Sequence, residues 1–508
     1  MHNFGKLIKH LENTKVSIVY YLMFFLFVIS IRNFWEMFIY NSPIIFVFHW
    51  HYIVFYIALA LALIIIMHFA IGSKIKKISR VILSGFIFIF LAPIFDYLIS
   101  ERNYYIEEYY IGYLEPPYAG SLWQRFFTFF GPYKDGAGVT PGIHFEMLIL
   151  FIAIFLYVFI KKRSWFRAII TTLISYATIF VYFAAPYFIN WFLKIFGLSY
   201  EYSEKIITNF FLLVAFILAL VLFYLYSKKY FIAIFKDIRI FRLIHFELMF
   251  FVGALLALIY FPNKESFFNQ EFLFYWIFLV IAIACAWIFS VITNNITDYN
   301  LDKINSPERP LTSNKIPMGH YRIMAVIFFL LACIYSLAVH FVPFMMIFSF
   351  MAFYFIYSMP PFRLKTVPIL SKFIIAVNSL TMIMMGFVHN SGEIAIPSAV
   401  AIFVLLGFTA VINFIDIKDY EGDKAHGIKT LPTILGLKNS KRLIAIFMFL
   451  AYLLSYLLLK STYLFVIFTL AGALQFYFIT RPNYKEKPVF ITYIISILIF
   501  IIYNWLNL

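Results

Sequence analysis

Long apolar segments, separated by short polar ones, recur along the whole chain. A helix needs roughly 20 apolar residues to cross the hydrocarbon core of a bilayer, and about fifteen segments approach that length. The first six are predicted at 16–38, 52–71, 79–99, 143–160, 167–192 and 206–227. The others are predicted at 242–260, 273–293, 321–340, 342–358, 372–388, 397–415, 441–459, 462–480 and 489–506. The pattern therefore predicts an all-α, polytopic, multi-pass membrane protein.

The composition agrees with this fold class, and few residues outside the predicted spans remain to form a soluble domain. Of the 508 residues, 64% are hydrophobic and 13% are charged, which is about half the charged fraction of a typical soluble domain. The formal net charge of +16 would suit nucleic acid. However, the basic residues lie in short loops between the spans, so we exclude nucleic acid as a partner. Cys285 and Cys333 both lie in apolar segments and predict neither a disulfide framework nor a metal site.

Basic residues are concentrated in every second loop between the first spans. They cluster at 6–15, 74–80, 161–167 and 228–242, whereas the loops between these are poor in Lys and Arg or acidic. The positive-inside rule therefore predicts the cytoplasmic (cell) membrane, with the N-terminus in the cytoplasm and the C-terminus outside. The first span lacks a small-residue cleavage site and contains charged residues, so we expect a retained helix rather than a signal peptide.

Two acidic segments follow spans that end on the predicted cytoplasmic side. "NNITDYNLDKINSPERPL" begins at Asn294, and "DIKDYEGDKAHGIKTLP" begins at Asp416. Within them, Asn294, Asp298 and Asp302 are four residues apart, and Asp416, Asp419 and Asp423 are spaced i, i+3, i+7. Either spacing places its three side chains on one face of a helix. A single acidic residue at a helix end is usually just solvated, but two such triplets on one membrane face indicate a shared site.

Opposed carboxylates repel each other and lose hydration when they are buried, and a divalent cation between them removes both costs. Carboxylate and amide oxygens suit Mg²⁺, which also binds substrate phosphates. The basic side chains near the motifs are candidates for holding phosphate oxygens, although each taken singly is more often a topology signal. These are Lys303, Arg309, Lys315, Arg363, Lys365, Lys424 and Lys429. Such a site would stabilise a diphosphate leaving group, and an isoprenoid tail on that diphosphate would lie within the membrane.

These segments together resemble the signatures of the UbiA superfamily of intramembrane prenyltransferases. The segment from Asn294 is similar to the first signature, N-x-x-x-D-x-x-x-D followed by N-x-P-x-R-P. The segment from Asp416 is similar to the second, with its G-D and G-I-K-T-L-P continuation, and "YSMPPFRLK" from Tyr357 is similar to a third landmark. The resemblance extends over about residues 230–508 and is specific as a set, although each motif alone would be weak.

The resemblance implies a nine-helix bundle around a lipid-open cavity, with Mg²⁺-dependent transfer of a prenyl group from a polyprenyl diphosphate to a hydrophobic or aromatic acceptor. It implies that the catalytic carboxylates are Asp298, Asp302, Asp419 and Asp423. It implies that the metal is bound by these four with Asn294 and Asp416. It implies that the diphosphate is held by Asn294, by Arg309 and by Arg363 or Lys365, and that Tyr357 lines the cavity. Many relatives carry Asp where this chain has Asn295, so we expect a modest effect on metal affinity.

The identity of the acceptor is open at this point. The segment "EGDKAHGIKTLP" resembles branches that prenylate glycerolipid phosphates in ether-lipid synthesis, chlorophyll-type alcohols and homogentisate, whereas "YSMPPFRLK" favours the latter two. We therefore expect an aromatic or lipid acceptor, as in lipid or quinone biosynthesis, with a glycerolipid phosphate as the alternative. Arg242 and His245 could orient an acidic acceptor, although a snorkelling arginine and an interfacial histidine explain them equally well. A cation transporter or channel is the alternative from another functional class.

The first 229 residues show no resemblance to this family. We expect a domain of about six helices at 1–229 before the transferase domain at 230–508. A long outer loop is predicted at 101–142, and long loops in compact proteins are often functional. Polar residues near the outer side could form a further site, although interface placement explains most of them. They are His49, His51, Asp96, His144 and Glu146.

Overall fold

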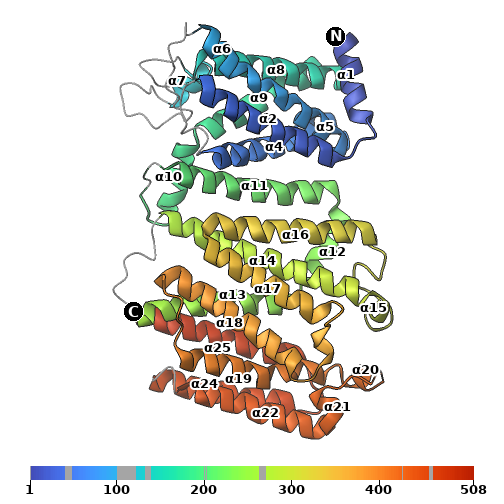
Figure 1. Ribbon diagram of the computed structural model, residues 1–508, viewed down its shortest axis with the longest axis vertical. Coiled ribbons are helices and arrows are strands. Elements are labelled where there is room, and N and C mark those ends of the chain that lie inside the picture. The colour runs from blue at the N-terminus through green and yellow to red at the C-terminus, as the bar shows by residue number, and fades with distance from the viewer. Residues whose placement is uncertain are drawn as a thin grey trace. The chain divides into compact units, whose positions relative to one another are not determined.

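The computed structural model describes residues 2–39, 48–99, 122–131, 139–199, 201, 203–261, 270–425, 427–456 and 461–507. The secondary structure of these residues is helical (Figure 1). Within them, 14 helical segments are long and apolar enough to cross a membrane. The prediction of an all-α, multi-pass membrane protein is therefore confirmed. The outer loop predicted at 101–142 lies largely outside the described residues.

One predicted span accounts for the difference between about fifteen segments and these 14. The segment predicted at 441–459 forms helix α22 (Leu437–Leu454). Its first turns carry Lys438, Lys441 and Arg442, so its N-terminal part is too charged for the hydrocarbon core. Residues 457–460 of the predicted span lie outside the described residues.

The helix contacts divide the chain into two compact units, Met1–Lys228 with Phe268–Phe274 and Lys229–Phe267 with Tyr275–Leu508. The first unit contains α1 (His2–Asn13), α2 (Ile18–Ile39), α4 (His49–Ile71), α5 (Ile75–Gly85), η1 (Phe86–Phe90), α6 (Leu91–Ile99), α7 (Leu122–Phe127), α8 (Pro141–Lys162), α9 (Trp165–Phe183), α10 (Ala185–Ile195) and α11 (Glu204–Tyr226). The predicted domain division between residues 229 and 230 stays a prediction.

The span predicted at 167–192 is two helices rather than one. Helix α9 ends at Phe183, and α10 begins at Ala185 with Pro186 in its first turn. Proline has no backbone N–H to continue the ladder of the preceding helix, and its fixed φ suits the start of a new one. The apolar pattern runs through this break, which is why hydropathy alone predicted a single span.

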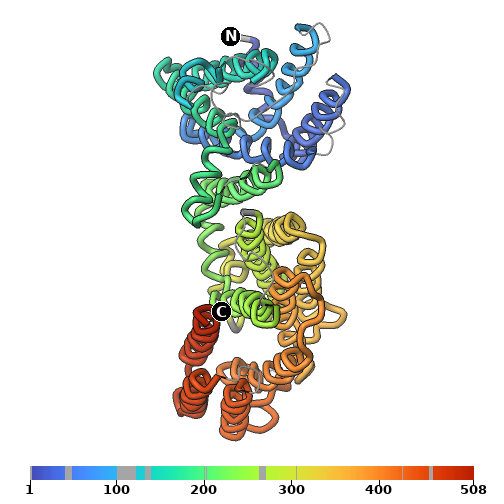
Figure 2. Tube along the Cα trace, turned by 90° about the vertical axis from the view of Figure 1, so that its left-hand side faces the viewer, coloured from blue at the N-terminus to red at the C-terminus, as the bar shows by residue number. Residues whose placement is uncertain are grey.

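The second unit contains the predicted transferase segments, and Figure 2 views its helices close to end-on. The first residue of α12 and the first turn of α14 are grouped with the first unit, and the rest of both helices belongs to the second. Its elements are α12 (Lys228–Lys236), α13 (Ile240–Tyr260), α14 (Gln270–Thr297), α15 (Tyr299–Asn305), α16 (Met318–Val339), α17 (Phe341–Ser358), η2 (Leu364–Thr366), α18 (Leu370–Ser391), α19 (Ser398–Val411), η3 (Ile412–Ile417), α20 (Tyr420–Ala425), α21 (Leu431–Leu435), α22, α24 (Thr462–Thr480) and α25 (Glu486–Leu506).

Helices α13 and α18 pack with their backbones in direct contact. A Cβ atom on Gly253 of α13 would lie 1.8 Å from the backbone oxygen of Ile383, and one on Gly386 of α18 would lie 2.0 Å from that of Phe250. Lipid tails are as apolar as the helices, so association in a membrane depends on close packing, which small residues allow. Each helix thus contributes one glycine to a mutual contact that fixes the pair.

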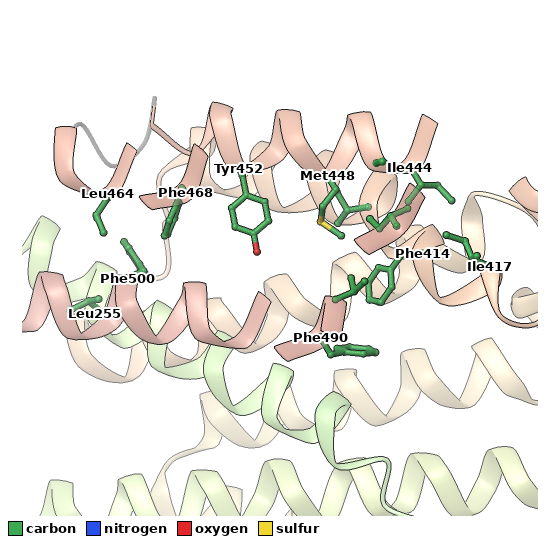
Figure 3. Close-up of a cluster of buried hydrophobic side chains, with 14 residues drawn as sticks. Leu255, Phe414, Ile417, Ile444, Met448, Tyr452, Leu464, Phe468, Phe490 and Phe500 are labelled. Carbon is green, nitrogen blue, oxygen red and sulfur yellow. The ribbon is translucent and has the colours of Figure 1, made fainter. Parts of the chain in front are cut away.

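The last helices pack around a cluster of buried apolar side chains (Figure 3). Met448 and Tyr452 of α22, Phe468 of α24, Phe490 of α25 and Phe414 of η3 belong to it. Phe414 lies two residues before Asp416 in sequence, so this cluster fixes the backbone that carries the second acidic motif. The edge-to-face packing of Phe414 against Phe490, with ring centroids 5.1 Å apart, contributes to that fixation.

Candidate active site

The first acidic motif spans the end of helix α14 and the short helix α15 that follows it. Helix α14 ends at Thr297, and α15 begins at Tyr299, with Asp298 between them. Backbone bonds from Asp298 N to Asn294 O, 2.9 Å, and from Asp302 N to Asp298 O, 2.7 Å, preserve the helical register across the break. The three residues therefore stay on one side, as their four-residue spacing predicts.

The second acidic motif is less regular than the single α-helical face suggested by its spacing. Asp416 lies in the 3₁₀ helix η3, Asp419 lies in a turn, and Asp423 lies in α20. Residues three apart eclipse each other in a 3₁₀ helix, so Asp416 and Asp419 are still brought to one side. The bond from Asp423 N to Asp419 O, 2.8 Å, continues the chain in helical register.

Both motifs line a single cavity of about 1400 Å³ within the second unit. All six predicted metal ligands contribute to its lining: Asn294, Asp298, Asp302, Asp416, Asp419 and Asp423. Aromatic side chains, including Phe246, Trp287, Tyr354 and the predicted Tyr357, line other parts of the wall. This volume exceeds that of a typical small-molecule pocket, about 300–1,000 Å³. The cavity therefore joins a highly charged region to an apolar one, with space for more than one substrate.

The carboxylates of this cavity are paired with basic side chains from other elements. Asp298 Oδ2 lies 2.5 Å from Lys365 Nζ, and Asp298 Oδ1 lies 3.1 Å from Arg363 Nη2. Asp302 is paired with Arg309. The structure thus brings together the predicted residues Arg309, Arg363 and Lys365 with the first motif.

The second motif has a cationic partner that sequence reasoning did not include in the site. Lys372 Nζ lies 2.6 Å from Asp416 Oδ1, and both side chains are buried. Lys372 lies in the transmembrane helix α18. A lysine inside an apolar span is costly and is usually functional, so its position was the signal that could have identified it.

The donor set around the cavity fits a divalent cation. Asp416 Oδ2 is buried and has no hydrogen-bond partner among the described residues. Burial, and then the charges of Asp416 and Asp419, raise the pKa of Asp423 to about 6. Within the described residues, no three acidic, histidine or cysteine side chains converge on one point. A cation bound between the motifs would therefore have to displace part of the lysine and arginine pairing.

The raised pKa of Asp423 predicts a pH-dependent stability difference. In the unfolded protein, an Asp side chain has a pKa of about 4. At pH values between about 4 and about 6, the folded protein therefore binds the Asp423 proton more tightly than the unfolded protein does. Ionised Asp423 then opposes folding, and its unfavourable effect grows as pH rises through this window. In metal-free detergent solution, we expect Asp423→Asn to raise Tm relative to wild type at a pH of about 7.5 but not at about 4.5. A pH-independent Tm difference would contradict this assignment.

Asn295 belongs to a polar network behind the cavity wall rather than to the cavity itself. Its amide nitrogen lies 2.6 Å from Asp237 Oδ2 and 2.9 Å from the Tyr321 hydroxyl. Its oxygen accepts bonds from Arg239, 3.4 Å, and Arg309, 3.3 Å. The amide can donate to Asp237 and accept from the arginines at the same time, which a carboxylate cannot do. Asn295 therefore positions Arg309, a role that neighbouring residues in sequence did not reveal.

The remaining predicted residues differ in where the structure places them. Lys429, Arg242 and His245 line the cavity. Lys303 and Lys424 are exposed and lie over the rings of Tyr299 and Tyr420, and neither lines the cavity. Lys315 donates to the backbone oxygen of Glu308 and is likewise outside the lining.

His245 connects three helices of the bundle. Its ring nitrogens lie 2.7 Å from the Tyr493 hydroxyl of α25 and 2.8 Å from Ser379 Oγ of α18. Both nitrogens are engaged in the described structure, so His245 is arranged to hold the cavity wall in place. Arg242, one turn earlier on α13, makes no hydrogen bond or ion pair with the described residues.

Comparison with known proteins identifies the same family as the acidic motifs that line this cavity. Residues 247–505 match the UbiA prenyltransferase family, a stretch that makes up half of the chain. The chain belongs to the UbiA prenyltransferase family. The family predicted from the two acidic motifs is thus confirmed, and the UbiA match lies within the segment that the motifs indicated.

Curated relatives of this UbiA-family chain include digeranylgeranylglyceryl phosphate synthases. That of Thermococcus sibiricus is 31% identical over 171 residues, covering 34% of this chain and 59% of the relative. That of Methanobrevibacter smithii is 32% identical over 157 residues, covering 29% of this chain and 54% of the relative. The chain thus spans a little more than half of the length of these two relatives.

Solved UbiA homologs also align with the chain. A homolog from Archaeoglobus fulgidus bound to DMAPP and Mg²⁺ is 17% identical, covers 54% of this chain and 97% of its own, and has a TM-score of 0.44. A digeranylgeranylglyceryl phosphate synthase structure is 22% identical, covers 55% of this chain and 99% of its own, and has a TM-score of 0.41.

Proposed function

We propose that this UbiA-family protein transfers a prenyl group from a polyprenyl diphosphate to a glycerolipid phosphate, in a Mg²⁺-dependent reaction within the membrane. The observation that carries the proposal is the excess of cationic side chains around the cavity. Among the lining residues that the structure describes, ten are Lys or Arg and six are Asp or Glu. A neutral alcohol acceptor does not require this excess, and a phosphate-bearing acceptor uses more of it than the single carboxylate of homogentisate.

Five of the ten cationic side chains form no salt bridge with the described residues. They are Lys236, Arg239, Arg242, Lys429 and Lys487. Arg242 and Lys429 make no hydrogen bond to the described residues either. Arg239 and Arg242 are half-buried, and a half-buried cation without a salt bridge is costly unless an anionic ligand neutralises it. The three lysines are exposed at the edge of the cavity, where they can reach an anionic ligand. We assign these five to the phosphate of the acceptor and the outer oxygens of the diphosphate.

The acidic motifs supply the donor side of the reaction. Asn294, Asp298, Asp302, Asp416, Asp419 and Asp423 would hold Mg²⁺, as the family resemblance predicts. When bound, the metal would neutralise the charge that develops on the departing diphosphate. Arg309, Arg363 and Lys365 already lie against the first motif. They would donate hydrogen bonds to the diphosphate oxygens once the metal takes over the carboxylates.

The transfer itself breaks the bond between the prenyl C1 atom and the diphosphate oxygen. The electron pair leaves with the diphosphate, and the resulting allylic cation lies among aromatic rings of the wall, such as Trp287, Tyr354 and Tyr357. Ring faces stabilise cations, and the apolar wall excludes the water that would otherwise capture this one. A hydroxyl oxygen of the acceptor then forms the new bond to C1, and its proton passes to the released diphosphate.

The family relatives favour a different acceptor from the one that the sequence motifs favoured. "YSMPPFRLK" suggested homogentisate or a chlorophyll-type alcohol, whereas the relatives are named as digeranylgeranylglyceryl phosphate synthases. The cationic excess agrees with the relatives, so we place the phosphate acceptor first. We retain the predicted topology, with the N-terminus and the site on the cytoplasmic side of the cell membrane.

The direct test is an assay of the purified full-length protein with Mg²⁺, radiolabelled geranylgeranyl diphosphate and three acceptors. These are geranylgeranylglyceryl phosphate, the same compound without its phosphate, and homogentisate. We expect turnover with the phosphorylated acceptor alone. Arg242→Met should raise KM for that acceptor by roughly tenfold or more, because a hydrogen bond to a charged group is lost.

Arg322→Met is the matched control, because Arg322 is exposed and lies outside the cavity lining. It should leave KM unchanged. Turnover with homogentisate but not with the phosphorylated acceptor would overturn the acceptor assignment. A lack of turnover with every acceptor and prenyl donor would overturn the proposed reaction as a whole.

A further inference from the structure

The first unit contains its own cavity, of about 330 Å³, which does not involve the acidic motifs. It is lined by residues of α1, α2, α4, α5, η1 and α8 and by the last residue of α9. Helices α1, α2, α4, α5 and α8 are labelled near the N-terminus in Figure 1. Its walls are largely apolar, as Leu59, Phe86 and Ile154 illustrate. The volume lies at the lower end of the range for small-molecule sites and suits one narrow apolar chain.

A few ionisable side chains interrupt this apolar lining, and two of them are satisfied. Arg32 and Glu36 form a buried bidentate pair, with distances of 2.8 and 2.7 Å. Arg32 Nε also donates to Ile89 O, 3.1 Å. His51 Nδ1 lies 2.6 Å from Thr208 Oγ1. These contacts hold Arg32 and His51 within the structure of the unit.

Most of the outer polar residues suggested by the sequence serve the local structure. Asp96 accepts hydrogen bonds from Thr140 Oγ1, 2.5 Å, and Gly142 N, 2.6 Å, and thereby secures the start of α8. His144 contacts backbone oxygens, at 3.0 Å from Thr140 O. His49 lies 2.9 Å from the amide of Asn33. This leaves Glu146 as the residue of that group whose role the local structure does not account for.

Glu146 lines the cavity with an unused oxygen. Its side chain is 4% exposed, and Oε2 is buried without a hydrogen-bond partner among the described residues. The nearby cation, Arg32, already uses both terminal nitrogens on Glu36. A buried polar atom without a partner is costly. A ligand that donates a hydrogen bond to Oε2 would remove that cost.

We propose that this cavity binds a single-chain amphiphile whose head group donates a hydrogen bond to Glu146 and whose chain lies along the apolar wall. The donor is either a hydroxyl or an ammonium group, since both bind a carboxylate oxygen. A carboxylate or phosphate head would be repelled by Glu146. The site lies in the unit without transferase motifs, so it does not rest on the proposed function.

The proposal can be tested with a photoreactive, diazirine-bearing dodecanol and the full-length protein in lipid nanodiscs. We expect ultraviolet crosslinks on α4 and α8, and competition by unlabelled dodecanol. Dodecyl methyl ether has the same chain but no donor, so it should compete roughly tenfold less well or worse. This comparison uses the wild-type protein and does not depend on the folding of any variant.

Two variants test the head-group contact and the binding of the apolar chain separately. Glu146→Leu should reduce labelling by roughly tenfold or more, and Ala153→Phe, which places a ring into the cavity wall, should block it. Leu148→Phe lies on the same helix but is 49% exposed, so it should label as wild type does.

A third variant identifies the donor within the proposed class. If dodecylamine outcompetes dodecanol and loses that advantage in Glu146→Gln, the head is an ammonium group. If dodecanol competes as well or better, the head is a hydroxyl group. Equal competition by the methyl ether, wild-type labelling of Glu146→Leu, or crosslinks confined to other segments would each overturn the proposal.

Discussion

Asp298→Asn is expected to reduce kcat for prenyl transfer by about 10²–10³-fold, the cost of removing one group that stabilises developing charge. Asp298 is buried and lies at the point where Lys365, Arg363 and the first motif meet. The amide keeps the shape but removes the charge that would hold the metal. Initial rates with radiolabelled geranylgeranyl diphosphate at saturating Mg²⁺ measure the effect.

The same substitution is also expected to lower Tm, because it leaves Lys365 with 16% side-chain exposure and without its carboxylate partner. Stability and activity can be separated with the double variant Asp298→Asn/Lys365→Met. Removal of both charges should restore Tm in large part, because the uncompensated ammonium is gone, while activity stays lost. Recovery of activity together with Tm would show that Asp298 acts only through stability.

Glu308→Gln serves as the matched control for this experiment. Glu308 is an exposed acidic residue in the loop after α15, and it does not line the cavity. We expect wild-type kcat and Tm. An equal loss of activity in this control would mean that any charge change near α15 impairs the enzyme, which contradicts a specific role for Asp298.

Gly253→Ala is expected to lower the free energy of unfolding by about 1–3 kcal/mol, the range typical of overpacked interiors. The added Cβ would lie 1.8 Å from Ile383 O, a backbone atom that cannot rotate away. Relief requires α13 and α18 to separate, which also shifts His245 and its contacts with Ser379 and Tyr493. Thermal denaturation in detergent, followed by size-exclusion chromatography, measures the loss.

Gly407→Ala is the matched control on another spanning helix. A Cβ at Gly407 in α19 meets no atom within 4 Å, so alanine should raise stability by about 0.5–1 kcal/mol through its better helix propensity. A similar loss in both variants would indicate that any glycine substitution in a span is harmful. That result would contradict the assigned backbone contact.

The cavity residues differ in how far local sequence could identify them. Asn294, Asp298 and Asp302 were predictable because their spacing alone places them on one helical face. The break at Asp298 and the 3₁₀ geometry of η3 were not, because they depend on how the helix ends pack. Lys372 and Asp416 are 44 residues apart, and no local pattern pairs them.

By itself, the sequence determined that this is a helical membrane protein with two acidic motifs that follow apolar spans. Span length and the four-residue spacing are local properties of a chain in a bilayer, so they need no knowledge of neighbouring elements. The tertiary structure decided which cation meets which carboxylate, that Asn295 faces Asp237 rather than the cavity, and that Glu146 keeps an unused oxygen. Those outcomes depend on contacts between helices that are distant in sequence, where packing and the pairing of buried polar groups select one partner among many.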